Sequence, residues 1–229
     1  MIGLIGAMQV EMEQLLSQLT ESKTHTIGTM KFYTGKLYNH DAVLAICGPG
    51  KINAALCAQA MILTFKPDWV MNLGVAGAIS SKLTIGDMVI ATGAVQHDMD
   101  TSGLGDPVGL ISGINQITLP CDEELRAHIN AAASKLQHLR TFEGLVATGD
   151  QFIANGARKD WIAEHFDALC CEMEGGAVAH ACYMHGVKCA VIRSISDQAD
   201  GNADMDYPHF VQLAAAHSAE LVKTLLESM

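Results

Sequence analysis

The sequence contains few charged residues, few aromatic residues and no long apolar run. Charged residues make up 17% and aromatic residues 5% of the 229 residues, whereas hydrophobic residues make up 49%. This hydrophobic content excludes an intrinsically disordered chain and is sufficient for one domain with a full core. Apolar runs end well before the roughly 18 residues that a membrane span needs. The N-terminus also lacks the basic and long apolar segments of a secretory signal. These absences predict a cytoplasmic protein with no membrane partner.

Basic residues are also scarce, and no cysteine pair has a familiar spacing. The 14 Lys and Arg residues are outnumbered by 25 Asp and Glu residues, which gives a formal net charge of -11. This charge argues against a nucleic-acid partner, because a phosphate backbone requires basic contacts. The seven cysteines are odd in number and form no Cys-x-x-Cys motif. We therefore expect buried, reduced thiols.

Strand-like apolar runs alternate with helix-like segments along the chain. Strands are predicted at residues 2–6, 41–47, 68–73, 85–95, 141–147 and 187–195. Helices are predicted at residues 9–20, 51–65, 122–136, 158–165, 175–183 and 210–226. This alternation predicts an α/β fold over residues 1–229, with a central mixed and mostly parallel twisted sheet flanked by helices. The long Gly-rich loop from His97 to Pro120 is typical of a lid or an interface.

One Gly-rich turn looks like a phosphate-binding loop without matching its pattern. Residues 48–51 read Gly-Pro-Gly-Lys, but Ala45 and Ile52 do not fit a P-loop. Asn53 stands where a dinucleotide fingerprint would need glycine. Two interpretations stay open: a tight strand-to-helix turn, and a turn whose backbone N–H groups meet a ligand.

No metal site or other cofactor is predicted. His97, Asp98 and Asp100 are candidate metal ligands, but no complementary cluster occurs elsewhere in the sequence. We therefore expect a solvated acidic turn at these three residues.

Acidic residues stand where buried apolar segments give way to other elements. Glu172 and Glu174 form one such pair, and Asp197 and Asp200 follow a second apolar segment. An α/β protein places its chemistry at these junctions, and a carboxylate there costs desolvation energy unless something uses it. Because one carboxylate can hold a substrate while another moves a proton, the pattern predicts an enzyme.

Six short blocks, in order along nearly the whole chain, resemble purine-nucleoside-cleaving enzymes of the phosphorylase superfamily. They are residues 6–11, 48–55, 74–77, 149–153, 172–174 and 194–197. The greatest similarity is to 5′-methylthioadenosine/S-adenosylhomocysteine nucleosidases. The resemblance implies a nucleoside phosphorylase-like fold and hydrolysis of the N-glycosidic bond of these two nucleosides. Adenine would be released, as in methionine salvage.

The resemblance also implies roles for individual residues. Asp197 would protonate N7 of the leaving adenine, which requires an environment that raises the pKa of its carboxyl group. Glu174 would accept hydrogen bonds from the ribose hydroxyls, and Met173 would pack on the sugar. Glu11 would be the general base that activates water. Ordinary alternatives stay open: Asp197 as a helix cap, and Glu11 as a first-turn acid favoured by the helix dipole.

Further implied positions surround the base and the 5′ group. Phe152 would stack on adenine and the Ile153 backbone would read its edge, with core packing as the alternative for both. Met8, Pro49 and Tyr207 would line the pocket for the 5′-alkylthio group, with Tyr207 as a lid. The other implied substrate-binding positions are Val75, Ala76, Gly77, Arg193 and Ser196.

The long loop carries the implied subunit contact. Thr101 and Leu104 match positions that the family donates across a dimer interface, so we expect a homodimer in which these two residues reach the neighbouring site. Two departures concern substrate preference and rate: Val75 stands where many nucleosidases carry Ser, and Pro49 replaces the more usual Ile.

Water is the predicted nucleophile. A phosphate nucleophile needs a basic clamp, yet no Arg precedes Arg126 and Glu11 lies near the first turn. Arg193 alone would hold a phosphate ion only weakly. Its expected role is to orient Glu11 or the water. Two other functions stay open: a nucleosidase for another adenine nucleoside such as 6-amino-6-deoxyfutalosine, and a non-catalytic nucleoside-binding protein on the same fold.

Overall fold

The computed structural model describes residues 1–200 and 203–229, apart from the side chains of residues 203–206 and 209. The strands of this part of the chain are β1 (Ile2–Gly6), β2 (Thr20–Ile27), β3 (Met30–Leu37), β4 (His40–Ile46), β5 (Trp69–Ala78), β6 (Met88–Gln96), β7 (Thr118–Pro120), β8 (Thr141–Thr148), β9 (Ala168–Glu172) and β10 (Lys188–Asp197). The α-helices are α1 (Gln9–Ser17), α2 (Lys51–Phe65), α3 (Glu123–Ala133), α4 (Gly156–Phe166), α5 (Gly175–His185) and α6 (Ala203–Leu226). A short 3-10 helix covers Ser102–Leu104.

All these strands belong to one sheet, part of which closes on itself. Strands β5, β9, β8, β6 and β10 each pair with the next, and β10 pairs again with β5. Strands β1, β4, β3 and β2 continue outward from β5. The β5–β10 and β6–β8 ladders are parallel and run through the middle of the sheet. A central mixed sheet flanked by helices was the predicted fold class, and it is confirmed.

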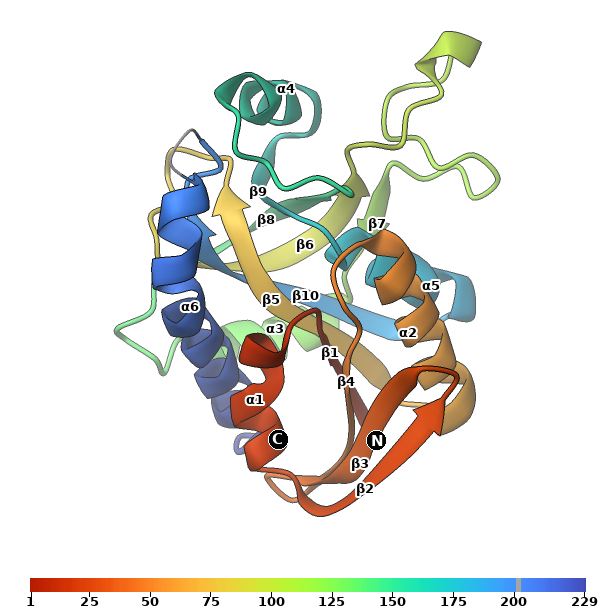
Figure 1. Ribbon diagram of the computed structural model, residues 1–229, viewed down its shortest axis with the longest axis vertical. Coiled ribbons are helices and arrows are strands. Elements are labelled where there is room, and N and C mark those ends of the chain that lie inside the picture. Colours follow the sequence, from red (N-terminus) through yellow and green to blue (C-terminus); the bar gives the residue numbers. More distant parts are fainter. Residues whose placement is uncertain (201–202) are drawn as a thin grey trace.

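Helices pack on the sheet in separate groups (Figure 1). Helices α2 and α5 pack together over one apolar cluster whose buried members include Cys57, Met61, Val178 and Cys182. Helices α1, α3 and α6 cover another cluster, which includes Leu15, Ile129, Leu221 and Leu225. Helix α4 covers a third cluster, which includes Ile162 and Phe166. The sheet is therefore covered on both faces, as alternating strands and helices predict.

Several predicted element boundaries were wrong or incomplete. Residues 20–37 carried no strand prediction, but they form β2 and β3, an antiparallel hairpin at the outer edge of the sheet. Strand β9 was also not predicted. Helix α1 ends at Ser17 rather than at residue 20, and α6 begins at Ala203 rather than at residue 210. The earlier start of α6 matters because it places Tyr207 on a helix.

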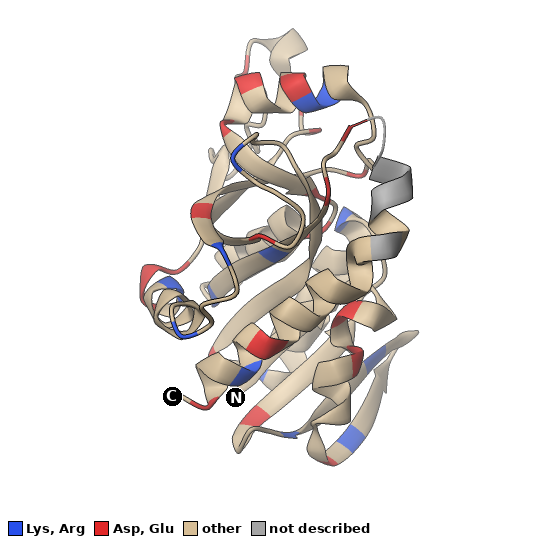
Figure 2. Cartoon of the chain, turned by 90° about the vertical axis from the view of Figure 1, so that its left-hand side faces the viewer, with Lys and Arg blue, Asp and Glu red and all other residues tan. Residues whose placement is uncertain are grey.

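The loop predicted from His97 to Pro120 is long, and it projects away from the sheet at the top of Figure 1. It includes the 3-10 helix and strand β7, which pairs with β6. Lys and Arg appear in Figure 2 as short separate segments among acidic ones on the side in view, rather than as one basic face. None of the helices of residues 1–200 and 203–229 has the length and apolar character that crossing a membrane requires.

Candidate active site

A cavity of about 230 Å³ lies beside the carboxyl ends of strands β1, β5, β9 and β10. In parallel α/β sheets, ligands bind at this end of the strands. The cavity is lined by Ala7, Met8, Glu11, Pro49, Val75, Ala76, Gly77, Gln151, Phe152, Ile153, Cys171, Glu172, Met173, Glu174, Ser196, Asp197 and Tyr207. It brings together segments from both ends and the middle of the chain.

Glu11 reaches the cavity from the first turn of helix α1. Its Oε2 atom accepts hydrogen bonds from the backbone N–H groups of Ala7 and Met8, at 2.7 and 2.8 Å. Its Oε1 atom accepts one from Val75 N–H at 3.1 Å. The bond to Met8 is half of a capping box, so the first-turn interpretation also holds. Burial raises the pKa of Glu11, although Arg193 and the three N–H groups act in the opposite direction. A raised pKa makes this carboxylate a stronger base.

Asp197 ends strand β10 at a bulge in its ladder with β5. Its Oδ2 atom accepts a hydrogen bond from Ser196 Oγ at 2.8 Å, and its Oδ1 atom accepts one from Ala199 N–H at 2.9 Å. The carboxyl group is buried, with 2% of the residue exposed. A bulge re-aims a side chain, and here Asp197 lies on the cavity wall beside Ser196.

Two glycines of β5 leave the room that these carboxylates occupy. A Cβ atom on Gly74 would lie 2.7 Å from Glu11 Oε1, and one on Gly77 would lie 2.7 Å from Asp197 Oδ1. Real Cβ atoms essentially never come within 3.0 Å of a non-bonded atom from elsewhere in the chain. The Gly-Val-Ala-Gly block therefore allows β5 to pass directly beside both acids.

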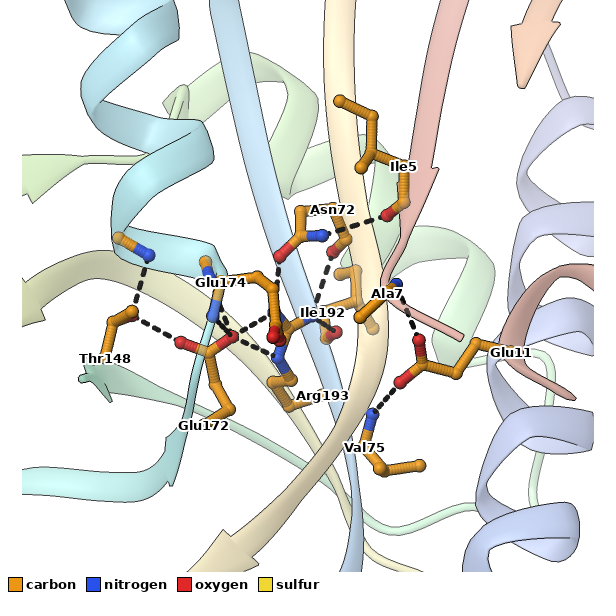
Figure 3. Close-up of polar contacts among 12 residues, drawn as sticks. Ile5, Ala7, Glu11, Asn72, Val75, Thr148, Glu172, Glu174, Ile192 and Arg193 are labelled. Atoms are coloured by element: carbon orange, nitrogen blue, oxygen red, sulfur yellow. Dashed lines mark hydrogen bonds and ion pairs between the residues drawn. The ribbon is translucent and has the colours of Figure 1, made fainter. Parts of the chain in front are cut away.

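A buried ion pair joins Glu172, in the cavity wall, to Arg193 (Figure 3). Arg193 Nε donates to Glu172 Oε2 at 3.0 Å, and Arg193 Nη2 also contacts Glu172 and Asn72 Oδ1. Thr148 Oγ1 donates to Glu172 as well. Burial alone would raise the pKa of Glu172, but Arg193 and Thr148 hold the pKa below its usual value. Arg193 itself does not line the cavity. Its guanidinium group is bound by Glu172 and Asn72.

Glu174 stands at the N-cap of helix α5, two residues beyond Glu172. Its Oε1 atom accepts a hydrogen bond from Gly50 N–H at 2.7 Å, so it joins the β4–α2 turn to the cavity. Burial and the charge of Glu172 raise the pKa of Glu174 to about 7. The two neighbouring carboxyl groups thus have pKa values that are shifted in opposite directions, a pattern common at active sites.

Aromatic residues and a methionine lie together at one wall of the cavity. Phe152, which is 51% exposed, packs edge-on against Tyr207 with ring centroids 5.8 Å apart. Tyr207 Oη donates to Met8 Sδ at 2.9 Å. Burial and nearby carboxylates raise the pKa of Tyr207 to about 12, so its hydroxyl group remains a donor at neutral pH.

Most of the predicted site residues line this one cavity. The exceptions are Arg193, which lies behind it, and Thr101 and Leu104, which belong to the projecting loop. Leu104 is 86% exposed. Sequence reasoning did not select the lining residues Ala7, Gln151 and Cys171, and it assigned Glu172 no individual role. Ala7, Gln151 and Glu172 each adjoin a predicted residue in the sequence and Cys171 is two residues from Met173, and that proximity was the available signal.

The expectation of a solvated acidic turn at His97, Asp98 and Asp100 was wrong for two of the three residues. His97 is 1% exposed, and its Nδ1 atom lies 3.1 Å from Arg158 Nη2. Asp98 forms an ion pair with Lys51 at 2.6 Å. Only Asp100 is exposed. Local sequence could not show this, because Lys51 and Arg158 come from distant segments.

The charged residues that line the cavity in the described part of the chain are all acidic. Besides Glu172, which is paired with Arg193, three buried carboxyl groups line its wall, those of Glu11, Glu174 and Asp197. No Lys or Arg is among the lining residues in the described part of the chain. The arrangement can accept hydrogen bonds, exchange protons and bind an apolar group beside Met8. It provides no cationic side chain that could bind an anionic ligand.

Comparison with known proteins gives consistent results. The family model described as the phosphorylase superfamily matches residues 1–227. The 5′-methylthioadenosine/S-adenosylhomocysteine nucleosidase of Shewanella oneidensis is 36% identical over 229 residues, which is 100% of this chain and 97% of that protein.

Solved structures of other proteins also resemble this chain over its whole length. The corresponding nucleosidase of Neisseria meningitidis, in complex with methylthio-immucillin-A, superposes with a TM-score of 0.96 at 32% identity, covering 100% of this chain and 99% of that one. A futalosine hydrolase of Helicobacter pylori superposes with a TM-score of 0.95 at 35% identity, covering 100% and 97%.

Proposed function

Because the chain belongs to the phosphorylase superfamily, we propose that it hydrolyses the N-glycosidic bond of 5′-methylthioadenosine and S-adenosylhomocysteine. The products are adenine and the 5-thio-substituted ribose. The observation that supports this function best is that three buried carboxyl groups, besides that of Glu172, surround one cavity with no basic lining residue in the described part of the chain.

Each carboxyl group has a distinct task in this proposal. Asp197 donates a proton to the leaving adenine, held in place by Ser196 Oγ and Ala199 N–H. Glu174 accepts hydrogen bonds from the ribose hydroxyls as the sugar gains oxocarbenium character. Glu11 removes a proton from the attacking water. Among the described residues its Oε1 atom accepts one hydrogen bond, from Val75 N–H, and so retains accepting capacity toward that water.

Hydrolysis is favoured over phosphorolysis by the surroundings of Arg193. A phosphate ion would need a free basic group in the cavity. Arg193 is 1% exposed and is bound to Glu172 and Asn72. Buried carboxylates repel phosphate, whereas they activate water.

The remaining lining residues bind the two ends of the substrate. Phe152 stacks on adenine, the Ile153 backbone reads the base edge and Met173 packs on the sugar. The apolar surface formed by Met8 and Pro49 suits the 5′-thioether, and Tyr207 covers it from helix α6. Val75, Ala76 and Gly77 form the floor under the ribose.

A homodimer and a cytoplasmic location are part of the proposal. Leu104 is 86% exposed on the projecting loop, close in sequence to Thr101. Helix α2 also exposes Ile52 and Leu56, at 72% and 58%. The family resemblance assigns Thr101 and Leu104 to a dimer contact, so the loop of each subunit would reach the neighbouring site. All seven cysteines are free, which fits a reducing compartment.

The similarity to a futalosine hydrolase supports a second candidate. The same three acids would cleave 6-amino-6-deoxyfutalosine, and only the surroundings of the 5′ group would differ. Pro49 and Val75, the two departures from the family pattern, line the cavity. Comparing kcat/KM for methylthioadenosine, adenosylhomocysteine and aminodeoxyfutalosine separates the candidates.

Incubation with methylthioadenosine, with and without inorganic phosphate, tests the reaction itself. We expect free adenine at a rate that does not depend on phosphate, together with 5-methylthioribose. Formation of a ribose 1-phosphate product would refute hydrolysis, and absence of adenine would refute the assigned substrate.

A further inference from the structure

The turn before helix α2 is capped by two carboxylates from distant parts of the chain. Gly50 N–H donates to Glu174 Oε1, and Lys51 N–H donates to Asp150 Oδ1, both at 2.7 Å. Gly50 has no side chain that could cap the helix. The Gly-Pro-Gly-Lys turn therefore does present N–H groups to anions, and in this structure those anions are side chains of the protein.

Asp150 is also joined to Asp98, which in turn binds Lys51. Asp150 N–H donates to Asp98 Oδ2 at 2.9 Å, and Lys51 Nζ donates to Asp98 Oδ1 at 2.6 Å. The side chains of Lys51 and Asp98 are only 20% and 17% exposed. Together with the Lys51 N–H bond to Asp150, these contacts form a closed cycle. We refer to Lys51, Asp98 and Asp150 as the 51–98–150 cluster.

The cluster lies outside the cavity, but it touches two of the segments that line it. Asp150 directly precedes residues 151–153, which include Phe152 and Ile153. Lys51 follows Gly50, whose N–H group holds Glu174. None of the three cluster residues is among the lining residues. The cluster thus connects the segment beside the base to the carboxylate beside the ribose.

Residues 151–153 need such a connection because they belong to no helix or strand. Gln151 and Phe152 are exposed, and ordering an exposed segment costs conformational entropy on binding. Charge-assisted hydrogen bonds of Asp150, the residue that precedes the segment, reduce that cost before the substrate arrives.

We propose that the 51–98–150 cluster is a positioning device for the substrate. It holds residues 151–153 at a set distance from Glu174, so that adenine and ribose are bound together in the orientation that Asp197 requires. The inference rests on the proposed function, which supplies the ligand. The cluster residues touch neither the substrate nor the reacting atoms, so they act on binding rather than on proton transfer.

Two substitutions at one position test the inference. Asp150→Ala removes the acceptor for Lys51 N–H and should raise the KM for methylthioadenosine roughly tenfold, with a smaller change in kcat. Asp150→Asn retains an oxygen acceptor of the same length and should restore most of the wild-type KM. Wild-type KM in Asp150→Ala would overturn the inference, as would equal impairment of the two variants or a loss confined to kcat.

A matched pair of lysine substitutions provides the control. Lys51→Met removes the ammonium group from Asp98 but keeps the backbone bond to Asp150, so we expect a KM increase of roughly threefold. Lys36 forms an ion pair of similar length with Asp41, at 2.8 Å, in the β3–β4 hairpin. Lys36→Met should leave KM unchanged. Equal effects of the two substitutions would contradict a positioning role.

Hydrogen–deuterium exchange separates this inference from the proposed function. Peptides covering residues 149–155 should exchange faster in Asp150→Ala than in the wild-type protein and at the wild-type rate in Lys36→Met. If the wild-type protein releases no adenine, the proposed function fails, whereas exchange still reports whether the cluster holds the segment. Equal exchange in Asp150→Ala and the wild-type protein would overturn the positioning role.

Discussion

Replacing Gly77 by alanine should displace the carboxyl group of Asp197 and slow the release of adenine. The new Cβ atom would lie 2.7 Å from Asp197 Oδ1 and 2.9 Å from Ala199 Cβ. Contacts closer than 3.0 Å are essentially never observed for real Cβ atoms. Asp197 or the β5 backbone at Gly77 must therefore shift by at least 0.3 Å, the difference between 3.0 and 2.7 Å, and either shift changes the position of the carboxyl group relative to the cavity.

The expected effect is on the rate of the chemical step. Because a misplacement of 1 Å can cost about 100-fold in rate, we expect kcat to fall between about tenfold and about 100-fold. The KM should also rise, because Gly77 belongs to the proposed floor under the ribose, but by less than kcat falls, since Glu174 and Phe152 are not displaced. Overpacking should also lower the free energy of unfolding by about 1–3 kcal/mol.

Adenine release measured at saturating methylthioadenosine, with a urea unfolding curve for each protein, checks both numbers. Gly156→Ala is the matched control, because its Cβ atom would have no neighbour within 4 Å. We expect that variant to keep wild-type kcat and stability. If Gly77→Ala also keeps kcat to within about twofold, the space beside Asp197 is not required and the reasoning is wrong.

Four further predictions follow from the same site. Asp197→Asn should lower adenine release by about 10²–10⁴-fold while methylthioadenosine still binds, as measured by calorimetry; unchanged release would exclude Asp197 as the proton donor. Because burial raises the pKa of Glu174 to about 7, its carboxylate form increases as the pH rises, and KM should fall between about pH 6 and about pH 8. Glu174→Gln should remove that dependence, and a flat KM in the wild-type protein would contradict it. Folding stability depends on pH in the opposite direction from substrate binding. The contribution of Glu174 to stability is largest below its usual pKa of 4.5 and is lost as the pH rises through about 7. Arg193→Met should lower the free energy of unfolding in urea by about 3–5 kcal/mol, because Glu172 is left buried without its cation, and a loss below about 1 kcal/mol would show that the pair is dispensable. Leu104→Glu should shift sedimentation toward the monomer and reduce activity in parallel, whereas an active monomer would exclude a shared site.

Local sequence predicted the central fold because burial has a local signature. Strands β1, β4, β5, β6, β8 and β10 are apolar runs, and the predicted ranges overlap them. Strand β2 is almost entirely exposed, and an exposed strand lacks that signature. Residues 20–37 therefore carried no prediction, although β2 and β3 pair along most of their length, with a register shift between Thr20 and Lys23.

The candidate site was predicted from short blocks rather than from periodicity. Glu11, Glu174 and Asp197 were selected by type and by resemblance, and they line one cavity. The roles of Lys51 and Asp98 were not predictable, because their partners are separated by tens of residues. For the same reason, the sequence predicted a solvated turn at His97 and Asp98.

By itself, the sequence determined the kind of elements, their order and the acidic residues available for chemistry, because these depend on residue types and short spacings. The tertiary structure alone decided which of those acids meet. Closure of the β5–β9–β8–β6–β10 ring brings Glu172 to Arg193, which makes that pair a support, and Glu172 lines the cavity together with Glu11, Glu174 and Asp197. Contacts between distant segments depend on how strands pair, and a local pattern does not record that pairing.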